Sequence, residues 1–196
     1  MATIDSRTPG VLSVLSETNT SDPTDALRSF VATACGYDLK DVRKRWVQKP
    51  GVRPPIAEDW AAVGITTMEV QGTDAYKGTR GEDDEIQSQF TTIVSHQKLH
   101  GIATFYGPDC LLYADRFRMA AMTPQNNDYL SSQAGVVFQD IDETLVRTPE
   151  QLLEQWVDRV DVRFVLGRRV ERVLGIRNIG SFDGIEIITE KGTLNG

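Results

Sequence analysis

The chain has 196 residues, 40% hydrophobic and 25% charged, which is enough for one core of ordinary size but would crowd two full domains. Its net charge of −7 argues against a protein that reads nucleic-acid sequence, because such proteins carry a basic surface. The first residues lack the basic and apolar regions of a signal peptide, and no apolar run approaches the roughly 18 residues of a membrane span.

Residues 1–21 are rich in Ser, Thr and Asp, with one apolar cluster at Val11, Val14 and Leu15. This composition predicts a flexible N-terminal arm, which could dock on a neighbour through the cluster. Residues 22–196 then form a single domain.

A helix is predicted over 23–35, where Leu27, Phe30 and Val31 recur at helical spacing and Gly36 suits the position after the last turn. Residues 42–48 predict a strand, because the prolines that follow make the next segment a rigid connector. The β-rich residues 60–70 predict a second strand.

Residues 71–84 read as a polar, glycine-containing loop that ends in an acidic run. Four adjacent acidic side chains diverge from one another, so a solvated loop tip is a better interpretation than a metal site. The acidic run consists of Glu82, Asp83, Asp84 and Glu85.

Two further strands, 86–95 and 98–106, predict a hairpin that closes near His96–Gln97. A helix over 109–122 begins after Gly107-Pro108, and a polar loop through 126–128 follows it. Neither histidine of the chain, His96 or His100, has the neighbours of a catalytic triad.

The long strand 156–166 alternates most clearly, because Val160, Val162 and Phe164 interleave with Asp161 and Arg163. Successive strand side chains point to opposite faces, so one face is buried and the other is charged. A short strand at 136–138 precedes it and a last strand at 184–189 follows. The residues predicted for the core are Leu27, Phe30, Val31, Phe117, Val160, Val162 and Phe164.

This order of elements predicts an α+β fold: a mixed, mostly antiparallel sheet with two main helices packed on one face. Cys35 and Cys110 fall in the two helices without the spacing of a zinc site, so we expect buried thiols, although a disulfide stays open.

The segment from Val136 to Leu145 resembles the first motif of haloacid dehalogenase-type phosphatases, Asp-x-Asp-x-Thr after a hydrophobic strand. Carried over, Asp140 is the nucleophile and Asp142 the general acid–base of a magnesium-dependent phosphatase. The context argues against it, because that motif opens a Rossmann-like sheet and only 52 residues follow Thr144 here. We interpret the two aspartates as turn residues between strands.

The early helix is followed by Val-Arg-Lys-Arg-Trp-Val-Gln at 42–48 and by Pro54-Pro55 with Asp59-Trp60. Phe-Tyr-Gly-Pro-Asp at 105–109 opens the second helix, and Trp-Val-Asp-Arg-Val-Asp at 156–161 begins the long strand. In order and spacing, these segments of residues 25–190 resemble the neck or tail-terminator proteins of contractile-tailed bacteriophages.

The resemblance implies a structural virion protein, made in the host cytoplasm, with no enzymatic activity and no cofactor. Such proteins form rings, usually hexamers, that terminate the tail tube and offer the head connector a docking surface. The implied partners are other copies of the chain, tail tube and sheath proteins, the head–tail connector, and genome DNA passing through the lumen. Candidate interface residues are the acidic run, Asp161, Arg163, and a basic cluster that follows the long strand, Arg168, Arg169 and Arg172.

Overall fold

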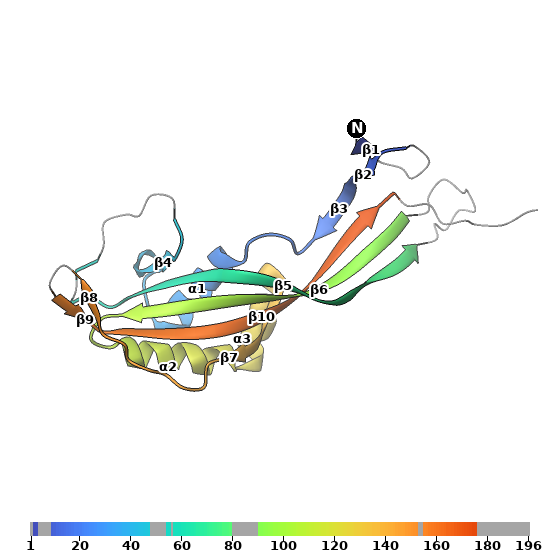
Figure 1. The fold of residues 1–196 in the computed structure, drawn as a ribbon. Helices are drawn as coiled ribbons and strands as arrows, with labels where there is room; N and C mark the ends of the chain where they lie inside the picture. Colours follow the sequence, from blue (N-terminus) through green and yellow to red (C-terminus); the bar gives the residue numbers. More distant parts are fainter. Residues whose placement is uncertain are drawn as a thin grey trace, which may run out of the picture.

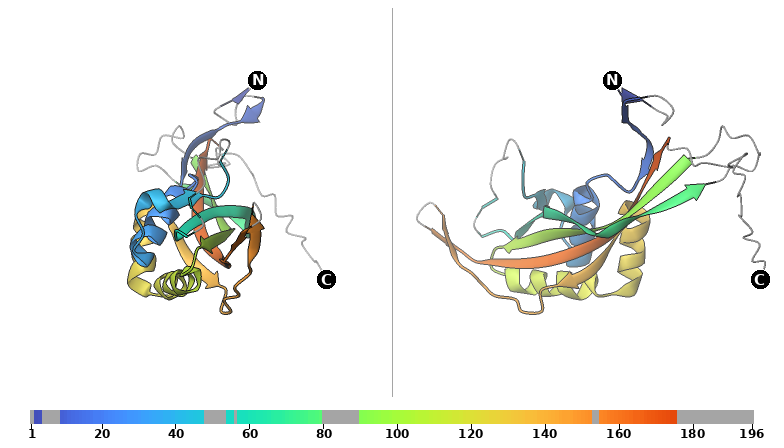
Figure 2. Two further views of the ribbon diagram at one scale, coloured as in Figure 1. Left: turned by 90° about the vertical axis from the view of Figure 1, so that its left-hand side faces the viewer. Right: turned by 45° about the vertical axis from the view of Figure 1, so that its right-hand side comes forward.

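Three helices lie on one face of a long sheet in the computed structural model, which describes residues 2–3, 9–47, 54–55, 57–79, 90–152 and 155–175 (Figure 1). The helices are α1 (Thr24–Cys35), α2 (Cys110–Ala121) and α3 (Pro124–Ala134), and a 3₁₀ turn, η1 (Leu39–Asp41), follows α1. Figure 2 shows the helices gathered on one side of the sheet. The α+β class is therefore confirmed.

The strands of the main sheet are ordered β3 (Val14–Thr18), β10 (Arg159–Leu174), β6 (Phe90–Tyr106), β5 (Trp60–Thr79) and β4 (Val42–Lys44). A sixth strand, β7 (Val136–Ile141), pairs with β10 on the edge that β3 also uses. Within this main sheet, every described pairing is antiparallel except that of β4 with β5. Two small sheets join β1 (Ala2–Thr3) to β2 (Val11–Leu12) and β8 (Glu150–Leu152) to β9 (Gln155–Val157).

The core lies between the helices and the inner face of the sheet, the face that the helices cover. All the residues predicted for it are buried. The ring of Phe117 meets the ring of Phe164 edge to face with centroids 5.8 Å apart, and Phe138 packs on Phe164 in the same way at 5.5 Å. Such pairs add about 0.5–1.5 kcal/mol to the burial of the rings. The alternation in the long strand therefore predicts its buried face correctly.

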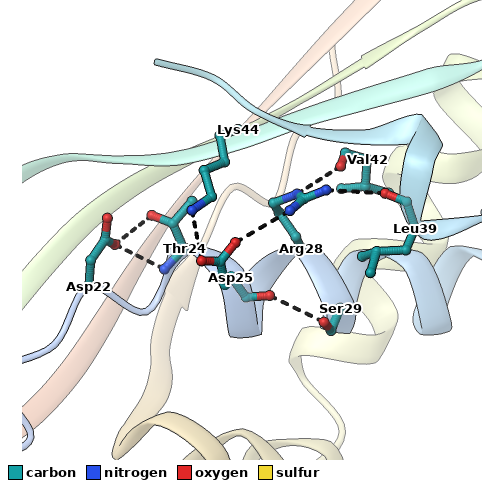
Figure 3. Close-up of polar contacts among 8 residues, drawn as sticks. All are labelled: Asp22, Thr24, Asp25, Arg28, Ser29, Leu39, Val42 and Lys44. Atoms are coloured by element: carbon teal, nitrogen blue, oxygen red, sulfur yellow. Dashed lines mark hydrogen bonds and ion pairs between the residues drawn. The ribbon is translucent and has the colours of Figure 1, made fainter. Parts of the chain in front are cut away.

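Polar contacts fix α1 to β4 (Figure 3). Arg28 Nε donates a hydrogen bond to the carbonyl oxygen of Val42 at 2.8 Å, and Lys44 Nζ donates one to Asp25 Oδ2 at 2.7 Å. The hydrogen bond from Lys44 lowers the pKa of the Asp25 carboxyl. These contacts hold the short strand against the helix, while its other side pairs with β5.

Strands β5, β6, β7 and β10 all extend beyond the ranges that the sequence indicates, and β10 continues past the predicted end at 166 to Leu174. Strand β6 continues through His96–Gln97, so the hairpin predicted to close there is wrong. Strand β5 continues to Thr79, so the interpretation of 71–84 as a loop is wrong for residues 71–79. The two strands pair with each other, Gln71 opposite His96 and Thr79 opposite Phe90, and this pairing keeps polar residues extended although their sequence alternates weakly.

The polar loop predicted through 126–128 is also wrong, because these residues lie in α3. Pro124 occupies the first turn of α3, and Gly135 ends the helix in the left-handed conformation at φ 64°. Among the described side chains of α3, only that of Leu130 is buried. With so small an apolar face the helix has almost no periodic signal, so composition alone favours a loop.

The structure describes part of the predicted N-terminal arm but not the strand predicted near the C-terminal end. Residues 14–18 of the predicted arm form β3, whose residues Val14 to Thr18 pair with Leu174 to Glu171 of β10. The division into an arm at 1–21 and a domain at 22–196 stays a prediction. The strand predicted at 184–189 and the acidic run at 82–85 lie outside the described residues.

Candidate assembly surface

A four-stranded ribbon projects beyond the helices (Figure 1). We define the ribbon as residues 14–18, 71–79, 90–96 and 169–174 of β3, β5, β6 and β10, and call the part with the helices the body. Each of the three long strands continues from the body into the ribbon, although the pairing of β5 with β6 is irregular at residues 72–74. The ribbon is therefore an extension of the body's own sheet. It offers two faces and two edges for contacts.

The basic cluster lies within β10, where the body meets the ribbon, so its predicted place after the long strand is wrong. Because strand side chains alternate, Arg168 and Arg172 lie on one face and Arg169 on the other. Arg172 Nε lies 3.4 Å from Glu17 Oε2 of β3, and an Arg169 nitrogen lies 2.5 Å from Glu171 Oε1. The cluster is therefore two separate, partly paired groups of charges.

Arg168 is the most enclosed of the three arginines. Its Nε donates a hydrogen bond to Gln97 Oε1 at 2.8 Å, and a terminal nitrogen donates to the carbonyl oxygen of Ser21 at 3.1 Å. Burial, followed by the charge of Arg172, lowers the pKa of its guanidinium. Arg168 thus links β10 to β6 and to the segment before α1 through uncharged acceptors.

Asp161 and Arg163 lie on the outer face of β10, the face away from the helices, as the alternation predicts. Asp161 accepts a hydrogen bond from the hydroxyl of buried Thr104 at 2.7 Å and another from Arg159 at 2.9 Å. Arg45 donates to the same hydroxyl of Thr104. Asp161 therefore belongs to an internal polar network, whereas the side chain of Arg163 is exposed.

A groove of about 410 Å³ lies where the body meets the ribbon. Its lining includes Trp46, Ile65 and Met68, together with Lys44 and Arg168. Trp46 is 56% exposed and Met68 52% exposed, so large apolar side chains face solvent beside two cations. Sequence reasoning missed this groove, because segments that are distant in the sequence build it. The tryptophan within a basic stretch is its one local signal.

The structure places the two motif aspartates at the end of β7. Asp140 is a strand residue opposite Val165, so its interpretation as a turn residue is wrong. Asp142 Oδ2 accepts a hydrogen bond from the backbone N–H of Arg163 at 2.9 Å. Strand β7 runs antiparallel to β10, unlike the Rossmann-like sheet in which the phosphatase motif works. Among the described residues, no three metal-ligating side chains gather as an ion would require.

Comparison with known proteins gives one informative match. A family model described as "Phage neck terminator protein" matches residues 21–193, which covers the helices and all the long strands. No curated protein matches the chain. Within the described residues, no helix is long and apolar enough to cross a membrane.

Proposed function

The chain belongs to the phage neck terminator protein family, and we propose that it forms a ring at the phage neck that terminates the tail tube. The family is one of structural proteins of the virion, and its match over residues 21–193 is the observation that carries the proposal. We infer further that the ring offers the head connector its docking surface.

The proposed partners are further copies of the chain, most simply six, with the tail tube and sheath on one side and the connector on the other. Genome DNA passes through the lumen without being read, in keeping with the net charge of −7. The described surface suits such a role, because ring closure needs two different patches on each subunit and the ribbon has two distinct edges.

The proposed subunit contacts use the charged side chains of the ribbon and of the strand that enters it. On one subunit these are Arg163, Arg168, Arg169 and Arg172, with Asp161 holding the strand beside them. On the next subunit we propose the acidic run, Glu82, Asp83, Asp84 and Glu85, whose sequence position lies between β5 and β6. Complementary charges would fix the register of the ring.

Mass measurement on the purified chain, alone and mixed with tail tube protein, tests this proposal. A subunit has a mass of 21.8 kDa, so a ring gives a species several times heavier and a round projection in negative stain. The ring is expected to cap tubes at one end and to stop their growth. Tubes that lengthen normally in its presence, with the chain remaining a monomer, would contradict it.

A further inference from the structure

Within the described part of the chain, one edge of the sheet has no partner strand over most of its length. Strand β4 pairs with β5 only at Ala61, Ala62 and Val63, and beyond Val63 no described strand lies on that side of β5. Among the described residues, the backbone N–H and C=O groups on this side of β5 therefore lack a partner strand as far as Thr79. Proteins normally cover so long an edge, because it otherwise pairs with other chains.

The side chains beside this edge also indicate a missing neighbour. Met68 is 52% exposed and Val70 50% exposed, and they follow each other on the inner face of β5. The groove with Trp46, Lys44 and Arg168 adjoins the same stretch. An occupant of this edge should therefore be an extended segment with both apolar and acidic side chains.

The sequence after β10 contains such a segment. Residues 184–190 read Gly-Ile-Glu-Ile-Ile-Thr-Glu, with isoleucines on both faces of an extended chain and two glutamates, and Asp183 precedes them. This segment was predicted as a strand from its sequence, and the family match extends past it to residue 193. It therefore lies within the residues that the family model matches.

The end of β10 determines where this segment can pair. Leu174 already lies opposite Val14 of β3 on one side and Thr91 of β6 on the other, so the next strand cannot join β10. Residues 175–183 can span about 30 Å, whereas β5 lies two strand spacings from β10, about 10 Å. A chain returning from the ribbon tip would run antiparallel to β5 but parallel to β3.

We propose that residues 184–190 add to the free edge of β5 of the same chain as an antiparallel strand. The order of the sheet then becomes β3, β10, β6, β5 and this C-terminal strand. On an extended strand Ile188 shares a face with Glu186 and Glu190. With that face inward, Ile188 lies beside Met68 and Val70, and the two glutamates face Arg168 at the groove. The added strand would cover the free edge of β5 and become the outer strand on that side, with β3 remaining the outer strand on the other.

Residue-resolved amide exchange on the isolated full chain tests the proposal. The N–H groups of residues 68–79 that point away from β6 should be protected from exchange. In a chain that ends at residue 182 they should exchange at least about tenfold faster, because they become solvent-exposed. A chain that ends at Glu190 is the control and should keep the protection. Equal exchange in all three chains would overturn the proposal.

A full-length variant is the control for misfolding of the truncated chain. Ile185→Ser, Ile187→Ser and Ile188→Ser together should release the same amides while those of β6 bonded to β10 stay protected. Cysteine pairs that join Val70→Cys to a cysteine at 185, 187 or 188 distinguish the source of the strand. A disulfide within one chain is expected; a product of twice the subunit mass would assign the strand to a second copy and overturn the proposal.

The inference does not depend on the proposed ring, since every measurement uses the isolated chain. Protection of β5 in a chain that never forms a ring would support the added strand and contradict the assembly proposal. A ring-forming chain with an unprotected β5 would do the reverse.

Discussion

At the scale of single residues, the contact between Gly101 and Phe164 shows how closely neighbouring strands pack beneath the helices. The two residues are cross-strand partners, and a Cβ atom at position 101 would overlap the ring of Phe164. Phe164 is 2% exposed and packs edge to face on Phe117 and Phe138. The absence of a side chain on one strand therefore makes room for an aromatic ring on the next.

Phe164→Ala should lower the free energy of unfolding by about 3–5 kcal/mol, because it leaves a cavity among aromatic rings. Gly101→Ala should cost about 1–3 kcal/mol through overpacking, but much less when combined with Phe164→Ala, which vacates the space. Denaturant unfolding of the two single variants and the double variant measures this coupling. Additive costs would show that the ring and the new methyl group do not compete.

Burial also sets the chemistry of the two thiols. Cys35 and Cys110 are both buried and free, and the Cys35 thiol donates a hydrogen bond to the carbonyl oxygen of Tyr113 at 3.4 Å. Burial raises the pKa of Cys35 to about 12 and also raises the pKa of Cys110. A thiolate is the reactive form, so both residues are held in the unreactive state at neutral pH.

We therefore expect neither thiol to react with a disulfide reagent at pH 8 while the protein is folded, and both to react in concentrated guanidinium. The absorbance of the released thiol measures the number of groups modified. One rapidly reacting thiol in the folded protein would place that cysteine at the surface, contrary to the structure.

At the scale of elements, β10 organises the sheet because it pairs with β3, β6 and β7. Its inner face supplies the core and its outer face carries the network of Asp161, Thr104 and Arg159. Thr104 is completely buried although it lies on the face away from the helices. The outer face of the body is therefore internally bonded rather than an open charged surface.

Thr104→Val keeps the shape of the side chain but removes the hydroxyl that links Asp161 to Arg45. We expect a loss of about 1–3 kcal/mol in the free energy of unfolding, because buried polar partners lose a hydrogen bond. Thr66→Val is the matched control, since its hydroxyl bonds the carbonyl oxygen of His100 at an exposed site and should cost less than about 0.5 kcal/mol. Equal losses would show that the network adds nothing to stability.

At the scale of the whole molecule, the body follows from sequence periodicity and the ribbon does not. Val160, Val162 and Phe164 contact helices, so their alternation is strong and predicts the buried face. The next inner-face residue of β10 after Leu166 is Arg168, whose side chain donates a hydrogen bond to Gln97 on β6. Such polar pairs form only when the strands meet, and a single segment cannot reveal them.

The same limit applies to the candidate site. Arg163 is exposed, as expected of a contact residue, but Asp161 is bonded inside its own subunit. Arg168 and Arg169 are neighbours in the sequence and therefore predict one basic cluster, whereas the strand places their side chains on opposite faces of the sheet. The groove is assembled from segments near residues 21, 46, 65 and 168, and no local pattern joins them.

Neutralising the acidic run tests the charge complementarity proposed for the ring. The fourfold variant Glu82→Gln, Asp83→Asn, Asp84→Asn and Glu85→Gln keeps the length of the connection and should weaken ring formation at least about tenfold, with weaker dependence on salt. The measurement is ring fraction against protein concentration, by mass photometry at two salt concentrations.

The control makes the same change in net charge on exposed acidic residues of the body: Asp38→Asn, Glu58→Gln, Asp128→Asn and Glu143→Gln. It should assemble as the original chain does. If both variants form rings equally well, the acidic run has no part in the contact between subunits.

The position of β10 in the sheet also decides when the chain can fold. This strand lies between β6 and β3, yet it is the last described strand to leave the ribosome, and Thr18 must wait for Glu171 to appear. Until then β5 and β6 can pair with each other and with β4, but the side of β6 that meets β10 has no partner among the described strands. Sheets that depend on pairing between strands distant in the sequence fold slowly, and their partly folded intermediates are prone to aggregate. Production of this protein should therefore respond to chaperone supply and to lower growth temperature during synthesis.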